Sequence, residues 1–181
     1  MNWWDIIKVA ASAGVLSAIL NQGFAVLIQH SREKKSAAYL ALRVAIILET
    51  FASECARKIR ALEYDDIQGI YDAGFPLTGE TLPQIAEYPD DDSWKHMPSD
   101  LASEALSFPN LIEQRRQAHS NWMDTIEAQQ EGFSEKLKDI KQMYGDLGMH
   151  SMKIAYDLRK KHRLPKLASE GEMTDFFESY S

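Results

Sequence analysis

Near its amino terminus the chain has a long uncharged segment, and an amphipathic segment follows it. Residues Val9 to Ser31 contain no Lys, Arg, Asp or Glu. A helix over this segment spans roughly 34 Å, enough to cross a hydrocarbon core of about 30 Å. A buried helix of a soluble bundle is the alternative, but such helices rarely run so far without a charge on their solvent side. The pattern therefore predicts a single transmembrane anchor, with residues 1–31 forming its short tail and span.

Charges on the two flanks of this segment indicate an orientation. Arg32, Lys34 and Lys35 follow the span at once, whereas Lys8 alone precedes it. By the positive-inside rule, the carboxyl-terminal side then stays in the cytoplasm and the amino terminus lies outside. The chain resembles the many small bacterial or phage inner-membrane proteins with one amino-terminal span and a helical cytoplasmic domain. That is a type without motifs, so it assigns no residues.

Small and amide side chains share one face of the expected span. They are Gly14, Ser17, Ala18, Asn21 and Gln22. Small residues let membrane helices approach closely, and amides bond across the interface for about 0.6 to 2 kcal/mol each. This face predicts self-association into a homo-oligomer, although small residues are also common in membrane helices generally. A further alternative is a membrane-active effector, in which assembled anchors permeabilise the bilayer through Asn21 and Gln22.

After the anchor, apolar residues recur at spacings of three and four, which predicts an all-α cytoplasmic bundle over residues 32–165. The expected helices cover residues 36–63, 99–107, 109–144 and 149–164. Phe108-Pro109-Asn110 is expected to break the chain between two of them, and Gly145 to Gly148 to form a turn. An eleven-residue apolar repeat along 109–144 favours packing along the bundle or, as in a coiled coil, along another copy.

Two segments lack a helical period. Residues 64–98 are rich in Gly, Pro and Asp and predict a long acidic loop, with Trp94 packed onto the bundle. A cation site or an enzyme built on this loop is the less favoured reading, because the Asp-x-Asp-x-Asp-Gly order of a calcium loop is missing. Residues 166–181 predict a flexible acidic tail. Its aromatic residues either dock another protein or fold back onto the bundle.

A basic run ends the last expected helix, at Arg159, Lys160, Lys161 and Arg163. Cations stabilise the carboxyl end of a helix through the macrodipole. They also attract anionic lipids of the inner leaflet, by about 1 kcal/mol for each residue close to the surface. The choice between a helix cap and a lipid contact depends on whether this helix end faces the membrane.

Composition narrows the function classes. The 27 Asp and Glu against 20 Lys and Arg, with a net charge of −7, argue against nucleic acid as a partner. No Glu-x-x-His, Gly-x-Ser-x-Gly or phosphate-loop motif occurs, so no catalytic, cofactor or metal residue is assigned. The expectation is a non-enzymatic protein that is anchored in the lipid bilayer, self-associates, and presents its bundle to a cytoplasmic protein partner.

Overall fold

The computed structural model describes the backbone of residues 3–67, 82–90, 92–126 and 133–180. Side chains are described within these ranges, except for residues 3–28, 30, 67, 119–126, 133–134 and 136. The described chain consists of α1 (Trp3–Ile67), the 3-10 helix η1 (Asp92–His96), α2 (Ser99–Ile126), α3 (Phe133–His162) and α4 (Glu170–Glu178). The prediction of an all-α fold with a helical bundle and one long amino-terminal helix is therefore confirmed.

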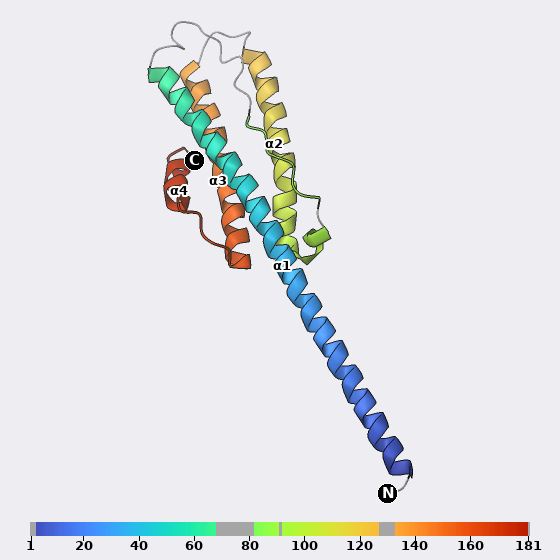
Figure 1. Ribbon diagram of the computed structural model, residues 1–181. Coiled ribbons are helices and arrows are strands. Elements are labelled where there is room, and N and C mark those ends of the chain that lie inside the picture. Colours follow the sequence, from blue (N-terminus) through green and yellow to red (C-terminus); the bar gives the residue numbers. More distant parts are fainter. Residues whose placement is uncertain (1–2, 68–81, 91, 127–132, 181) are drawn as a thin grey trace.

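The first helix, α1, runs without interruption from Trp3 to Ile67, a length of roughly 98 Å. Neither Pro nor Gly occurs between Ser31 and Ile67, so no residue in this part favours a kink. The predicted anchor segment and the first bundle helix are thus one continuous helix. Its amino-terminal end projects away from the other helices (Figure 1).

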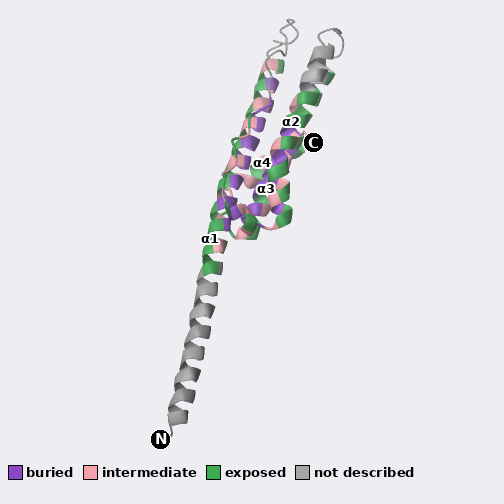
Figure 2. Ribbon diagram, turned by 90° about the vertical axis from the view of Figure 1, so that its right-hand side faces the viewer, coloured by how far each residue is buried: buried purple, intermediate pink, exposed green. Residues whose placement is uncertain are grey.

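The carboxyl-terminal half of α1 forms the centre of the bundle and packs mainly against α3. Its buried stripe follows the three-and-four spacing read from the sequence: Leu40, Val44, Leu48, Phe51, Cys55, Ile59 and Leu62. Helix α2 covers the same core, and the rings of Phe51 and Phe108 meet edge to face at 5.5 Å. Buried and exposed positions alternate along this part of α1, as expected for an amphipathic helix (Figure 2).

One helix near the amino terminus, α1, is long and apolar enough to span a membrane. Among the described residues, the segment that meets this test is Ser31–Asp66, and half of its most apolar window is buried inside the bundle. Its apolar side is therefore already covered by protein, as in the core helix of a soluble domain. Val9 to Ser31, where the anchor is predicted, has a helical backbone, but nearly all of its side chains lie outside the described residues.

The predicted break at Pro109 is wrong, because α2 continues through this residue from Ser99 to Ile126. Pro109 has no N–H to donate to the carbonyl of Ala105. However, Ala105, Phe108 and Ile112 are all buried on one side of α2, and this packing holds the helix together across the missing hydrogen bond. The expected single helix 109–144 is also wrong, since α2 ends at Ile126 and α3 begins at Phe133.

The predicted turn at Gly145 to Gly148 is wrong as well, because both glycines lie inside α3. A Cβ atom on Gly145 would come within 2.9 Å of the Cβ of Tyr180. A Cβ atom on Gly148 would come within 2.3 Å of the ring of Phe177. These two glycines therefore allow the close approach of α4 rather than a reversal of the chain.

The predicted flexible tail is wrong for the described residues up to Tyr180, because α4 folds back onto the bundle. Phe177 is fully buried in the core. The Tyr180 hydroxyl donates a hydrogen bond to Glu63 Oε1 at 2.5 Å, and the Arg60 guanidinium lies 4.8 Å from the centre of the Phe176 ring. Aromatic burial outweighs the polar character of this segment, so the fold-back alternative is the one observed.

The predicted loop over residues 64–98 is shorter than expected, because α1 extends to Ile67 and η1 occupies Asp92–His96. Its described part is attached to the bundle. Trp94 packs onto the core, as predicted, and its Nε1 donates a hydrogen bond to the Pro89 carbonyl at 3.0 Å. Residues 68–81 and 91 lie outside the described chain.

Candidate functional site

The carboxyl end of α3, the helix η1 and the start of α2 meet at one end of the bundle (Figure 1). The amino-terminal part of α1 emerges from this same end, which we call the anchor-side end. The basic run predicted at the end of the last helix therefore lies next to the residues that follow the expected span. The basic run and those residues thus share one end of the bundle.

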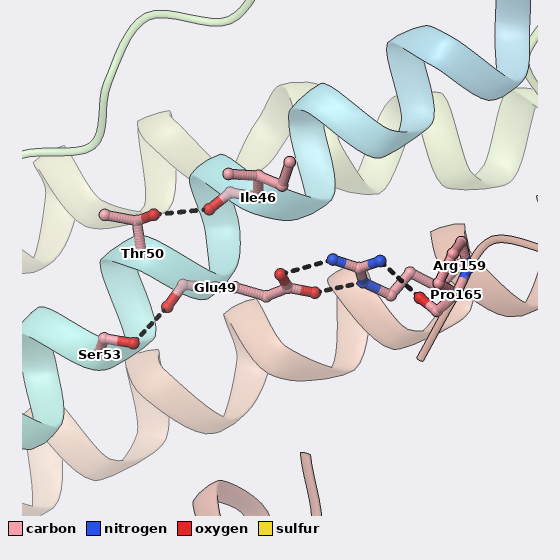
Figure 3. A network of polar contacts seen from close by, with 6 residues as sticks. All are labelled: Ile46, Glu49, Thr50, Ser53, Arg159 and Pro165. Atoms are coloured by element: carbon pink, nitrogen blue, oxygen red, sulfur yellow. Dashed lines mark hydrogen bonds and ion pairs between the residues drawn. The ribbon is translucent and has the colours of Figure 1, made fainter. Parts of the chain in front are cut away.

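Arg159, the first residue of the basic run, is held inside the bundle by Glu49 of α1 (Figure 3). Its Nε and Nη2 donate to the two carboxylate oxygens of Glu49 at 2.5 and 2.8 Å, and its Nη1 donates to the Pro165 carbonyl at 2.6 Å. Both side chains are 10 % exposed. The hydrogen bond to Glu49 raises the pKa of the guanidinium further above its usual range.

The pair holds Arg159, one of the four predicted lipid-contact residues, in a buried position between α3 and α1. A carboxylate buried on α1 requires a paired cation, and a bidentate guanidinium supplies both charge and hydrogen bonds. Arg159 thus ties α3 to α1 and positions the helix end that follows. Lys160 is exposed, with its Nζ 5.4 Å from the centre of the Tyr156 ring.

Helix α3 ends in a Schellman motif centred on Arg163. The Arg163 N–H donates to the Lys160 carbonyl at 3.4 Å, and the Leu164 N–H donates to the Arg159 carbonyl at 2.9 Å. Arg163 has a φ of 54°, in the left-handed region where Gly is the usual residue. For an L-residue this conformation costs roughly 1–2 kcal/mol.

A pocket of about 520 Å³ opens between these segments at the anchor-side end. Its polar lining comes from α1, η1 and the end of α3: Glu33, Lys34, His96, Lys161, His162 and Arg163. We call it the basic pocket. Two of the four predicted lipid-contact residues, Lys161 and Arg163, therefore line one cavity together with Lys34, which lies more than a hundred residues away in the sequence.

The basic pocket carries a local excess of positive charge. Lys34, Lys161 and Arg163 face one carboxylate, Glu33, whose Oε1 accepts a hydrogen bond from Gln29 at 3.0 Å. The pKa of His162 is lowered from its usual range, because burial disfavours the charged ring and Lys161 repels it. At neutral pH the positive charge therefore comes from the two lysines and the arginine.

His162 also contributes an unsatisfied polar atom. Its Nε2 is buried and has no hydrogen-bond partner within the described part of the chain. Buried polar atoms of this kind normally bond to protein, water or a ligand. His162 lies within the predicted basic run but was not among the predicted lipid-contact residues, and His96 was assigned nothing because it has no companion at ligand spacing.

The five residues predicted to mediate helix association are not tested by the structure. Gly14, Ser17, Ala18, Asn21 and Gln22 belong to the helical backbone of α1, but their side chains lie outside the described residues.

Candidate chemistry elsewhere is limited. Burial, aided by the charge of Glu54, raises the pKa of the Cys55 thiol to about 12, so at neutral pH it is not the reactive thiolate. Among the described side chains, no group of three His, Cys, Asp or Glu residues could hold a metal ion. No protein family, curated protein or solved structure matches the chain.

Proposed function

We propose that this is a single-pass, non-enzymatic protein of the inner membrane that self-associates and presents a helical bundle to cytoplasmic protein partners. The observation that supports it best is the continuity of α1 from Trp3 to Ile67. The uncharged segment Val9 to Ser31 passes directly into the helix that forms the core of the bundle. Such a connection transmits the position of the membrane segment to the bundle without a flexible linker.

The junction between the two parts has the charge that this orientation requires. Arg32, Lys34 and Lys35 occupy the first turn after the expected span, and all three are exposed. Lys and Arg at this position keep their segment on the cytoplasmic side. The bundle that follows is then held close to the inner leaflet, with the anchor-side end toward the lipid.

Self-association is supported by a face of α1 that continues from the expected span into the described part. Ala18, Ala25, Arg32, Tyr39 and Ile46 share one heptad register, which is apolar except at the junction residue Arg32. Tyr39 and Ile46 are 61 % and 49 % exposed, which is high for large apolar side chains on a core helix. A heptad seam of this kind is how two parallel helices pack along each other.

The anchor is tested by extracting membranes that contain the full chain with a carboxyl-terminal tag. Alkaline carbonate strips peripheral proteins and leaves spanning proteins in the pellet, so we expect the full chain to remain in the pellet. A variant in which Ala18 and Leu20 are both changed to Arg should lose the pellet fraction, because each charge at the span centre costs about 2.5–3.5 kcal/mol. Complete release of the unaltered chain would contradict the proposal.

Self-association is tested by crosslinking in membranes. The double substitution Gly14→Leu with Ala18→Leu should lower the yield of crosslinked oligomer, because leucines prevent the close approach of the two helices. The matched control is Ser12→Leu with Gly23→Leu, which adds similar bulk on the opposite side of the helix. Equal yields from the two double variants would show that the face with Gly14 and Ala18 does not mediate self-association.

A further inference from the structure

We propose that the basic pocket binds the phosphate headgroup of an anionic phospholipid in the inner leaflet. The inference rests on the proposed function in one respect, namely that α1 carries the pocket to the bilayer surface. The inference goes beyond anchoring, because it concerns the recognition of an anionic lipid headgroup by this pocket. The lipid would then fix the tilt and rotation of the bundle against the membrane.

The position of the pocket matches the depth of lipid headgroups. Lys34 lies three residues after Ser31, so it is roughly 4–5 Å along the helix axis from the end of the expected span. The headgroup layer on each side of the hydrocarbon core is roughly 5–8 Å thick. Because Lys161 and Arg163 line the same cavity as Lys34, the end of α3 reaches the same level.

The charge of the pocket is opposite to that of the chain. A protein with a net charge of −7 would be repelled by an anionic leaflet unless the surface facing it were basic. Lys34, Lys161 and Arg163 provide that surface from two helices that are distant in sequence. Their convergence on one cavity, three cations against the single carboxylate of Glu33, favours a bound anion over a purely diffuse attraction.

Hydrogen-bonding groups in the pocket also suit a phosphate. His162 lines one wall of the cavity, although its Nε2 is itself buried from solvent. His96 lies on another wall of the same cavity. Pro98, immediately before the start of α2, lines it too.

The identity of residue 163 supports a binding role most directly, because the backbone conformation of Arg163 favours Gly at this position. At a φ of 54°, Gly would complete the Schellman motif without strain. The chain has Arg at this position, where the side chain lines the basic pocket. Backbone strain that coincides with a charged pocket indicates that the side chain, rather than the fold, requires this residue.

The test measures lipid binding by the purified full chain in an uncharged detergent. Native mass spectrometry counts the molecules of dioctanoyl phosphatidylglycerol that each chain retains, with dioctanoyl phosphatidylcholine and inorganic phosphate as comparisons. We expect one phosphatidylglycerol per chain, weak retention of phosphatidylcholine, and no displacement by millimolar phosphate. Binding should weaken as salt rises, because it depends on exposed charge.

Variants then identify the site. The double substitution Lys34→Gln with Lys161→Gln should weaken binding about thirtyfold, the factor for two lost basic contacts. Arg163→Gly should weaken it about fivefold while leaving the melting temperature unchanged or higher, which separates binding from folding. The charge-matched control is Arg115→Gln with Lys138→Gln, two exposed residues away from the pocket, and it should bind as the unaltered chain does.

Several results would overturn the inference. Equal binding by the Lys34 and Lys161 double variant and by its control would show that the pocket is not the site. Equal retention of phosphatidylcholine would show that anionic charge is not recognised. Displacement by millimolar phosphate would reassign the pocket to a free anion. Because binding is measured in detergent, release of the chain by carbonate would refute the anchor without changing this result.

Discussion

Replacing Gly148 with Ala tests whether α4 is held by direct contact with the bare backbone of α3. At a solvent-exposed position inside a helix, this substitution would stabilise the protein by about 1 kcal/mol, because Gly is a poorer helix former than Ala. Here the added Cβ would lie 2.3 Å from the Phe177 ring, well inside the ordinary carbon contact of about 3.5–4.0 Å. Phe177 is fully buried, so its ring and α4 must shift together. We expect a net loss of roughly 1–3 kcal/mol.

Removing the ring should reverse the sign of this effect. Phe177→Ala alone should cost about 3–5 kcal/mol through lost burial and the cavity that remains. In that background Gly148→Ala no longer meets a ring, and it should stabilise by about 1 kcal/mol. The two substitutions are therefore expected to couple by roughly 2–4 kcal/mol. Urea unfolding of the full chain in an uncharged detergent, followed by far-ultraviolet circular dichroism, measures all four free energies.

Gly171→Ala is the control, because a Cβ at this position on α4 would have no atom within 4 Å. It should leave the stability unchanged or raise it slightly. A stabilising Gly148→Ala in both backgrounds would refute the reasoning, since it would mean that α4 does not pack against this glycine.

Three further predictions use the same unfolding assay. Glu49→Gln should destabilise by roughly 3–5 kcal/mol, because it leaves the buried Arg159 guanidinium without its counter-charge, whereas Glu49→Leu with Arg159→Met should recover most of that loss. Arg163→Gly should stabilise by about 1 kcal/mol, because it relieves the left-handed backbone. Stability should fall as the pH rises from about 9 to about 12, because the Cys55 thiol ionises from 9.0 when unfolded but only at about 12 when folded.

Each of these three has a result that would contradict it. A loss below 1 kcal/mol for Glu49→Gln would show that the ion pair is exposed to water. A destabilising Arg163→Gly would show that the side chain, not the backbone, holds the end of α3. If Cys55→Ala loses the same amount of stability at alkaline pH, the loss belongs to other groups, such as Tyr180, whose pKa is also raised to about 12.

The apolar stripe of α1 is the part of the fold that sequence reasoning recovers well. Leu40, Val44, Leu48 and the residues that follow at the same spacing are buried as the period requires. Helical periodicity reports which side of a helix is covered, and it does so independently of the covering partner. The packing of Trp94 onto the bundle could be predicted from its large apolar ring, although its hydrogen bond to Pro89 could not.

Breaks and turns were predicted less well, because the signals are local while the outcome depends on packing. Pro109 and the pair Gly145 and Gly148 are residues that usually end helices. In this chain Pro109 lies beside the buried Phe108, and Gly148 lies against Phe177 from a segment about thirty residues later. The burial of Phe108 depends on contact with Phe51 of α1, and no pattern near Gly148 shows Phe177.

The residues of the candidate site could be predicted from the sequence only in part. Sequence alone singled out Lys161 and Arg163 as basic residues at a helix end, and Lys34 as a residue that follows the expected span. Their meeting in one cavity depends on α3 running back along α1, where the shared apolar core and the Glu49–Arg159 pair join the two helices.

The sequence by itself determined the all-α class, the buried side of α1 and the charges that flank its uncharged segment. These features depend on the helical period and on the chemistry of single residues, which are local properties. Only the tertiary structure decided that α2 passes through Pro109, that α4 docks on two glycines, and that Arg159 faces inward while Arg163 lines a pocket. Those outcomes depend on contacts between residues far apart in the chain, whose free energies exceed the local preferences that they override.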